Sequence, residues 1–255
     1  MIDFITQVSR EAGKILLSYL TTSYHVSEKP GQGYVGDADL ASERYIIGQI
    51  DKSFPGSRII AEESGLTRKE VPAPLTWIID PLDGTTNFLH RFPFFSVSIA
   101  VMEGNTLAAG AVYDPFHEEL YSAVRGKGAW LNGKPIHVSD TTSFKDSLLI
   151  TGFYYHQGEQ LSRQVERFRR IQEITLSVRR LGSAALDLCY VASGRADGFW
   201  EDGLSSWDMA AGVLLIQEAG GRFTDRFGNP GDIFGPTVAC SNGAIHMDLL
   251  EALKD

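Results

Sequence analysis

The sequence predicts an α/β fold, in which helices and strands alternate along the chain. An apolar run of β-forming residues ends abruptly at Asp80, as a buried strand does where it reaches the edge of a sheet. Residues 95–124 alternate in polarity between turn residues, which is typical of an antiparallel meander. Elsewhere apolar residues recur at helical spacing, first over residues 5–19.

The remaining elements follow from the same two periodicities. Helices are expected at 5–19, 39–54, 161–174, from Ser183 onward, 208–219 and 245–253. Strands are expected at 58–61, 77–80, 96–101, 107–113, 120–124, 147–151, 196–201 and 237–241. Pro81 is expected to stop the strand before it, because proline fixes φ and removes a hydrogen-bond donor.

Two glycine-rich stretches are expected to be loops. Residues 27–36 contain Gly31, Gly33 and Gly36, which fit the dinucleotide pattern G-x-G-x-x-G. No strand precedes them, so the context that this pattern requires is missing, and we expect a flap beside an active site instead. Residues 126–133 are rich in turn formers and lack the spacing of a Walker loop.

The composition limits the class of protein. With 255 residues, 43% of them hydrophobic, the chain can bury a large core. It has no run of roughly 18 uncharged apolar residues, and its first twenty residues carry four charges, unlike a signal peptide. A cytoplasmic protein without membrane contact is therefore expected. Cys189 and Cys240 are far apart in apolar surroundings, which argues against a disulfide framework or a thiolate metal site.

The net charge of −9 argues against general nucleic-acid binding, which needs lysine and arginine to neutralise phosphates. Two explanations of the acidity stay open. It can serve solubility alone, or part of it can belong to carboxylates that hold metal ions for an anionic substrate.

The chemistry is expected where the strand at 77–80 ends. Asp80 and Asp83, on either side of Pro81, can turn both carboxylates toward one hard cation. Gly84 lets backbone N–H groups approach a phosphate, and Thr85 adds a hydroxyl. The alternative is an ordinary strand and turn, with the two aspartates as turn formers.

The whole string Asp-Pro-Leu-Asp-Gly-Thr-Thr-Asn-Phe over 80–88 closely resembles the signature of the inositol monophosphatase family. The Glu62-Glu63-Ser64 motif and the Trp-Asp-Met-Ala-Ala-Gly motif over 207–212 also match that family, so the resemblance spans nearly the whole chain. It is closest to bacterial-type inositol-1-monophosphatases. The resemblance implies a layered αβαβα sandwich, a homodimer, and two halves packed as one unit. Residues 1–145 would carry most metal ligands, and 146–255 would carry Asp208 and the substrate contacts.

Each acid outside the first motif also has an ordinary explanation, as a helix cap (Asp39), a solvated strand end (Glu62) or an acid favoured by a helix dipole (Asp208). The resemblance instead implies metal binding by Glu62, Asp80, the backbone carbonyl of Leu82, Asp83 and Asp208. It implies catalytic roles for Glu62, Thr85 and Asp39, which would hydrogen-bond Thr85. The implied substrate contacts are Asp83, Gly84, Thr85, Ser183, Ala184, Glu201 and Asp208.

Oxygen ligands of this kind suit Mg²⁺, or Mn²⁺, with two or three ions per site implied by the resemblance. The expected reaction is hydrolysis of a phosphate monoester by a metal-activated water. Inositol 1-phosphate is the best expectation, because the Glu201 carboxylate can accept hydrogen bonds from two neighbouring hydroxyls. Fructose 1,6-bisphosphate, histidinol phosphate and adenosine 3′,5′-bisphosphate stay open, and the resemblance also implies lithium sensitivity.

Two further interpretations stay open. Asp83-Gly84-Thr85 is similar to part of the haloacid dehalogenase motif, in which a carboxylate is the nucleophile, but two residues separate the acids here instead of one. Alternatively the protein docks a macromolecule, through the basic face of the helix at 161–174, which carries Arg163, Arg167, Arg169 and Arg170.

Overall fold

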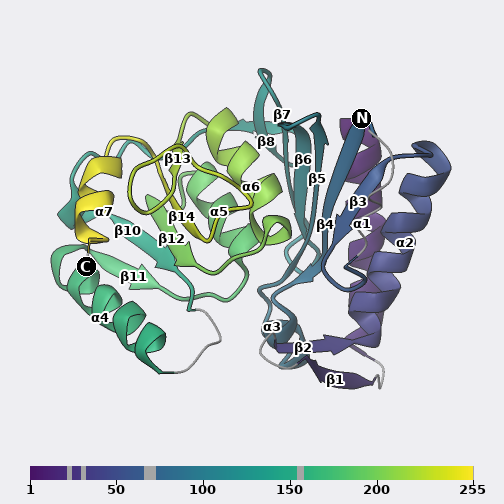
Figure 1. Ribbon diagram of the computed structural model, residues 1–255, viewed down its shortest axis with the longest axis horizontal. Helices are drawn as coiled ribbons and strands as arrows, with labels where there is room; N and C mark the ends of the chain where they lie inside the picture. The colour runs from purple at the N-terminus through teal and green to yellow at the C-terminus, as the bar shows by residue number, and fades with distance from the viewer. Residues whose placement is uncertain (22–24, 30–32, 66–72, 154–157, 255) are drawn as a thin grey trace.

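The chain folds into five layers of alternating helices and sheets (Figure 1). The computed structural model describes residues 1–21, 25–29, 33–65, 73–153 and 158–254. An outer layer of two helices packs on a seven-stranded sheet, two helices fill the middle, and a five-stranded sheet carries the last two helices. The predicted αβαβα sandwich is confirmed.

The element bounds, in layer order, begin with α1 (Ile2–Tyr19) and α2 (Asp37–Ser53). The seven-stranded sheet runs β3 (Arg58–Ala61), β4 (Leu75–Asp83), β5 (Ser96–Glu103), β6 (Thr106–Asp114), β7 (Glu119–Val124), β8 (Gly128–Leu131), β9 (Lys134–Ile136). The middle layer is α5 (Ala184–Ala192) and α6 (Ser206–Glu218). The five-stranded sheet runs β11 (Ser177–Arg179), β10 (Leu148–Thr151), β12 (Gly198–Asp202), β14 (Thr237–Ser241), β13 (Arg222–Thr224). The last layer is α4 (Glu159–Ile174) and α7 (His246–Ala252).

Four short elements lie outside the layers: the strands β1 (Val26–Lys29) and β2 (Gly33–Gly36), helix α3 (Thr85–Leu89) and the 3₁₀ helix η1 (Phe144–Asp146). The prediction of a loop over 27–36 was wrong, because β1 and β2 pair antiparallel. Gly31, which the sequence places between them, lies outside the described residues. The loop prediction for 126–133 was also wrong over β8, which pairs with β7.

The register of the first strands positions the acids. β3 and β4 run parallel, with Ala61 beside Ile79, so both strands end at the same edge of the sheet. The prediction that Pro81 stops the strand was wrong: β4 continues to Asp83, which pairs with Ser96 across a register shift. A bulge of this kind accommodates the proline and re-aims the side chains that follow it.

Three apolar clusters hold the layers together. On β4, Ile78 faces the cluster that joins both sheets through α5 and α6, whereas Trp77 and Ile79 face the cluster under α1 and α2. A third cluster lies under α4 and α7. β4 is thus buried on both faces, which explains why its sequence is continuously apolar.

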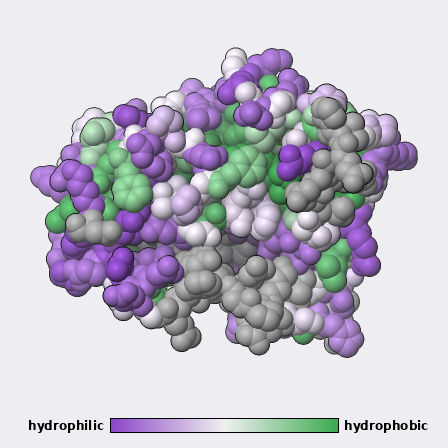
Figure 2. Space-filling view, in the orientation of Figure 1, coloured by the Kyte–Doolittle hydropathy of each residue, from purple (hydrophilic) through white to green (hydrophobic). Residues whose placement is uncertain are grey.

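The visible face of the molecule in Figure 2 is mostly hydrophilic, with its hydrophobic residues in small separate groups. Among the described residues, no helix combines the length and the apolar character that a membrane crossing requires.

The contact between α5 and α6 leads to a stability prediction. A Cβ atom added to Gly212 would lie 2.5 Å from Cβ of Leu188, whereas one added to Gly48 in α2 would meet nothing within 4 Å. We therefore expect Gly212→Ala to lower the free energy of unfolding by about 1 to 2 kcal/mol, because overpacking outweighs the gain in helix propensity. Gly48→Ala should raise it by up to about 1 kcal/mol. Urea unfolding of both variants checks this, and equal effects would contradict it.

Candidate active site

A cavity of about 470 Å³ lies where the middle helices meet the ends of β3 and β4. Its wall includes the first residues of three helices, namely Thr85 of α3, Ala184 of α5 and Asp208 of α6. Helix starts carry unpaired N–H groups and the positive end of the helix dipole. The cavity is thus suited to an anionic ligand.

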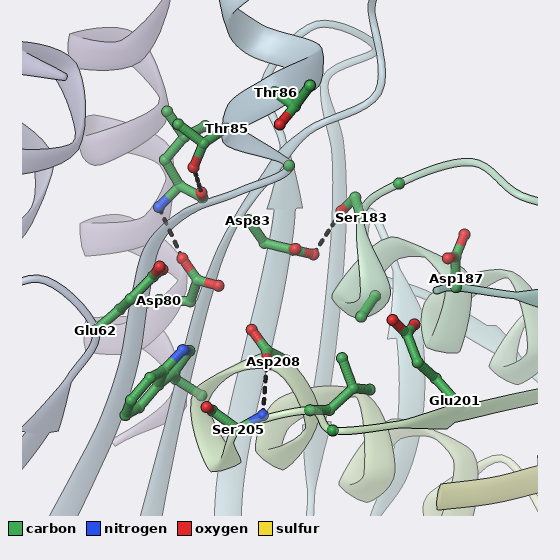
Figure 3. A pocket seen from close by; sticks show the side chains of 18 of the residues that line it. Glu62, Asp80, Asp83, Thr85, Thr86, Ser183, Asp187, Glu201, Ser205 and Asp208 are labelled. Carbon is green, nitrogen blue, oxygen red and sulfur yellow. Dashed lines mark hydrogen bonds between the residues drawn. The ribbon is translucent and has the colours of Figure 1, made fainter. Parts of the chain in front are cut away.

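Three carboxylates converge in the cavity (Figure 3). One oxygen each from Asp80, Asp83 and Asp208 lies within 4.8 Å of the others. Burial is the main cause that raises the pKa of Asp80 and of Asp208 well above the usual value, and the charges of the neighbouring acids add to it. Several buried like charges at such short range destabilise one another unless a cation neutralises them.

Glu62 and Leu82 lie beside this cluster. Glu62 directly follows β3, and its carboxyl group is close enough to hydrogen-bond that of Asp80. The Leu82 N–H donates to Asp80 Oδ1 at 3.0 Å, which fixes the orientation of that carboxylate. Both residues line the cavity, so all five predicted metal ligands lie in its wall.

Asp83 connects the seven-stranded sheet to the start of helix α5. Its Oδ2 accepts hydrogen bonds from the Ser183 hydroxyl at 2.6 Å and from the Ala185 N–H at 2.8 Å. Ser183 stands at the N-cap of α5, but its side chain makes no capping bond there and reaches Asp83 instead. Burial raises the pKa of Asp83 to about 6, although these two hydrogen bonds act against the rise.

Asp39 lies behind the cavity wall, next to Thr85. The Thr85 hydroxyl is 3.2 Å from Asp39 Oδ1 and 3.1 Å from the Leu82 carbonyl oxygen, so either acceptor is within hydrogen-bond distance of its single proton. Asp39 Oδ2 accepts from the Gly36 N–H at the start of α2, which completes a capping arrangement. Burial raises the pKa of Asp39 to about 6.

Gly84 allows the turn that brings Thr85 to the cavity. Its φ of 90° is rarely adopted by other residues, and a Cβ atom would lie 3.0 Å from the Phe94 carbonyl oxygen. The turn brings the N-terminus of α3 to the carboxylates.

Glu201 occupies the other end of the cavity, away from Glu62 (Figure 3). Burial raises its pKa to about 8, and the positive charge of Arg180 partly opposes the rise. A Cβ atom on Gly152 would lie 2.0 Å from the Glu201 carboxylate, so only glycine leaves room for it. Ala184 also lines the cavity.

The donors present fit a hard divalent cation. The described lining contains no histidine or cysteine, and its convergent groups are carboxylates beside a backbone carbonyl. Oxygen ligands of this kind are typical of Mg²⁺ and Mn²⁺ sites, and a divalent charge relieves the repulsion among the buried acids.

The cavity residues that were not predicted include Gly152 and Asp187. Gly152 gave no signal, because its role appears only when Glu201 packs against it. Asp187 stands in α5 and lines the cavity fully buried. The sequence does mark Asp187, because it is the one charged residue in the apolar run Ala184-Ala185-Leu186-Asp187-Leu188.

Comparison with known proteins agrees with this geometry. The sequence profile of the inositol monophosphatase family matches residues 1–255. The chain belongs to the inositol monophosphatase family. It is 41% identical over 253 residues to an inositol-1-monophosphatase of Synechocystis, covering 99% of this chain and 88% of that protein. It is 42% identical over 234 residues to the Nus factor SuhB of Pseudomonas aeruginosa, covering 90% and 86%.

Among solved structures, the extragenic suppressor protein suhB of Bartonella henselae superposes with a TM-score of 0.94 at 39% identity, covering 99% of this chain and 98% of that one. The inositol monophosphatase family consists of metal-dependent phosphatases that act on phosphorylated small molecules, so hydrolysis of a phosphate monoester is supported for this member.

The raised pKa values predict how stability depends on pH. Asp39 and Asp83, with pKa values of about 6 instead of 3.8, hold more protons when folded than when unfolded. Without divalent ions, this stabilisation is complete below about pH 4 and is lost as the pH rises through about 6. For Asp39 alone the loss is about 3 kcal/mol. We expect added Mg²⁺ to raise the melting temperature far more at pH 7.5 than at pH 5. A Mg²⁺ effect independent of pH would contradict this.

Proposed function

We propose that the protein is a Mg²⁺-dependent phosphatase of polyol phosphates, with inositol 1-phosphate as its substrate. One observation carries the proposal: a single cavity holds the cluster of Asp80, Asp83 and Asp208 at one end and the half-buried Glu201 at the other. This arrangement allows a phosphate to lie at the acids while its alcohol lies toward Glu201.

The residues of the cavity divide into those that hold ions and those that hold the substrate. Glu62, Asp80, the Leu82 carbonyl, Asp83 and Asp208 would hold Mg²⁺ ions. Bound divalent ions supply an acidified water and stabilise negative charge on the leaving oxygen. The N–H groups of Gly84 and Thr85 would bind the phosphate at the start of α3.

Thr85, Asp39 and Glu62 would orient the attacking water. Because Asp39 Oδ1 accepts from the Thr85 hydroxyl, it turns the oxygen lone pairs of Thr85 toward the cavity, where they can accept from water. Glu62 is the carboxylate next to Asp80 and can accept the second proton of that water.

Glu201 supports a polyol in preference to a second phosphate. Its carboxyl group can hydrogen-bond hydroxyls, and in its charged form it repels a second phosphate. A kcat/KM panel with Mg²⁺ on inositol 1-phosphate, fructose 1,6-bisphosphate, histidinol phosphate and adenosine 3′,5′-bisphosphate tests the assignment. The proposal fails if any of the other three exceeds inositol 1-phosphate.

The same panel leaves one chemical alternative to exclude, in which Asp80 is the nucleophile and becomes phosphorylated. The three crowded acids around Asp80 disfavour attack by that carboxylate on a phosphate dianion. Rapid-quench single turnover decides: a phosphorylated Asp80 would overturn direct attack by water, whereas phosphate released with no phosphorylated protein at any time point supports it.

Docking of a macromolecule is the second candidate function, because relatives such as those of P. aeruginosa and Escherichia coli carry the name Nus factor SuhB. The basic face of α4 gives it little support. Arg167 is buried against Asp202, Arg169 pairs with Glu166 and Glu173, and Arg170 donates to the Lys254 carbonyl. An inactive purified protein that captures a stable macromolecular partner would favour docking.

Several finer expectations remain predictions. Light scattering would test the homodimer, lithium inhibition of the purified enzyme would test lithium sensitivity, and separate expression of 1–145 and 146–255 would test whether the halves depend on each other. Cell fractionation would test the cytoplasmic location.

A further inference from the structure

The cavity contains a buried carboxyl group that the proposed reaction does not use. Asp187 is 1% exposed and lines the cavity from the first turn of α5. Among the residues that the structure describes, none forms a hydrogen bond with its Oδ1 atom. Leaving a buried polar atom unpaired destabilises a folded protein by about 1 to 3 kcal/mol.

The ordinary explanation of Asp187, an acid favoured by the dipole at a helix N-terminus, does not account for its burial. An exposed acid in the first turn gains the same dipole interaction without losing its hydration. The residues on either side, Leu186 and Leu188, are fully buried apolar side chains. A leucine at position 187 would pack there without an unpaired oxygen, so the carboxyl group requires another explanation.

Its surroundings indicate a polar ligand. Asp187 lies at the same end of the cavity as Glu201 in Figure 3. Burial is the main cause that raises its pKa, the charges of Glu201 and Asp83 add to the rise, and the charge of Arg180 opposes it. A substrate hydroxyl both donates and accepts, so it can bond a carboxyl group in either protonation state.

We propose that Asp187 is a specificity-determining residue that hydrogen-bonds a hydroxyl of the substrate alcohol. This hydroxyl lies beside those from which Glu201 accepts hydrogen bonds. This inference rests on the proposed phosphatase function and narrows its substrate class: the alcohol carries several neighbouring hydroxyl groups. A phosphate ester without them leaves both carboxyl groups unpaired in the cavity, which is how sites built for hydroxyls reject analogues.

The test compares two substrates in two variants. Asp187→Leu keeps the branched shape of the side chain, with larger methyl groups in place of the two oxygens, and removes hydrogen bonding, whereas Asp187→Asn keeps a polar group of the same shape. We expect the ratio of kcat/KM for inositol 1-phosphate to kcat/KM for p-nitrophenyl phosphate to fall at least about tenfold in Asp187→Leu, mainly through KM. Asp187→Asn should keep that ratio within about threefold of the wild type.

A thermal measurement separates this role from a structural one. Because Oδ1 has no protein partner, Asp187→Leu should raise the melting temperature of the substrate-free protein. The control is Asp197→Asn, since the Asp197 carboxylate is buried outside the cavity and accepts from the Ser139 hydroxyl and the Leu148 N–H. It should lower the melting temperature and leave the substrate ratio unchanged.

The outcomes separate the two proposals. An unchanged ratio in Asp187→Leu overturns the role of Asp187 alone, as does a lower melting temperature with an equal loss on both substrates. If the leucine variant does not fold, the same ratio of kcat/KM values is measured in Asp187→Ala, where it should also fall. A wild-type protein inactive on every phosphate monoester overturns the proposed function, and the role of Asp187 with it.

Discussion

Asp80→Asn should reduce kcat/KM by about 10³-fold, the largest effect we expect from a single substitution. Asp80 is the acid that contacts Glu62, lies with Asp83 and Asp208 and is fully buried. Loss of a central metal ligand removes several kcal/mol of transition-state stabilisation, and each 1.36 kcal/mol is tenfold in rate. Initial rates on inositol 1-phosphate across a Mg²⁺ titration measure the effect.

The same substitution should stabilise the metal-free protein. Asparagine can still accept the hydrogen bond of the Leu82 N–H, but it removes one of the crowded charges. We expect a higher melting temperature in EDTA and a smaller increase when Mg²⁺ is added.

The matched control is Asp114→Asn, another fully buried acid of the same sheet, which accepts from the Phe116 and His117 N–H groups outside the cavity. It should lose stability and keep its activity within about twofold. Wild-type activity in Asp80→Asn would refute the metal assignment.

Thr85→Ala should lower kcat by about 10²-fold while the response of the melting temperature to Mg²⁺ stays close to that of the wild type. The Thr85 hydroxyl has an acceptor in Asp39 Oδ1 and another in the Leu82 carbonyl, so it is held in one place at the cavity wall. A positioned group that orients a water or moves its proton contributes about 10² to 10⁴ in rate.

Two variants serve as controls for Thr85. Thr85→Ser keeps the hydroxyl and should keep most of the activity. Asp39→Asn replaces an acceptor by an amide that can donate to Thr85, so the hydroxyl loses its orientation and kcat should fall with Thr85 still present. If serine and alanine at position 85 reduce kcat equally, the hydroxyl has no role in the reaction.

The long periodic elements were predictable because each is encoded by its own residues. The apolar stripe of α1 and the continuous apolar run of β4 appear in the sequence at the spacing of a helix and of a buried strand. The strands β9, β11 and β13, of three residues each, were missed. They are too short to carry a periodic pattern of their own and are defined by the partner strand that lies beside them.

The donor set of the site was also readable from the sequence, because the spacing of Asp80, Asp83 and Thr85 is local and matches a known family signature. The orientation of these groups was not readable. Ser183 bonds Asp83 and does not cap its own helix, and Gly152 leaves room for the Glu201 carboxylate.

By itself, the sequence determined the family, the layered fold that the family resemblance implies, and the acids that are proposed to hold metal, since short motifs carry that information. Only the tertiary structure decided that Asp208 lies within 4.8 Å of Asp80 and that Asp187 is buried in the same cavity without a partner for Oδ1. Such proximity depends on how α5 and α6 pack between the two sheets. That packing is set by apolar contacts from many distant segments at once, which no stretch of sequence contains.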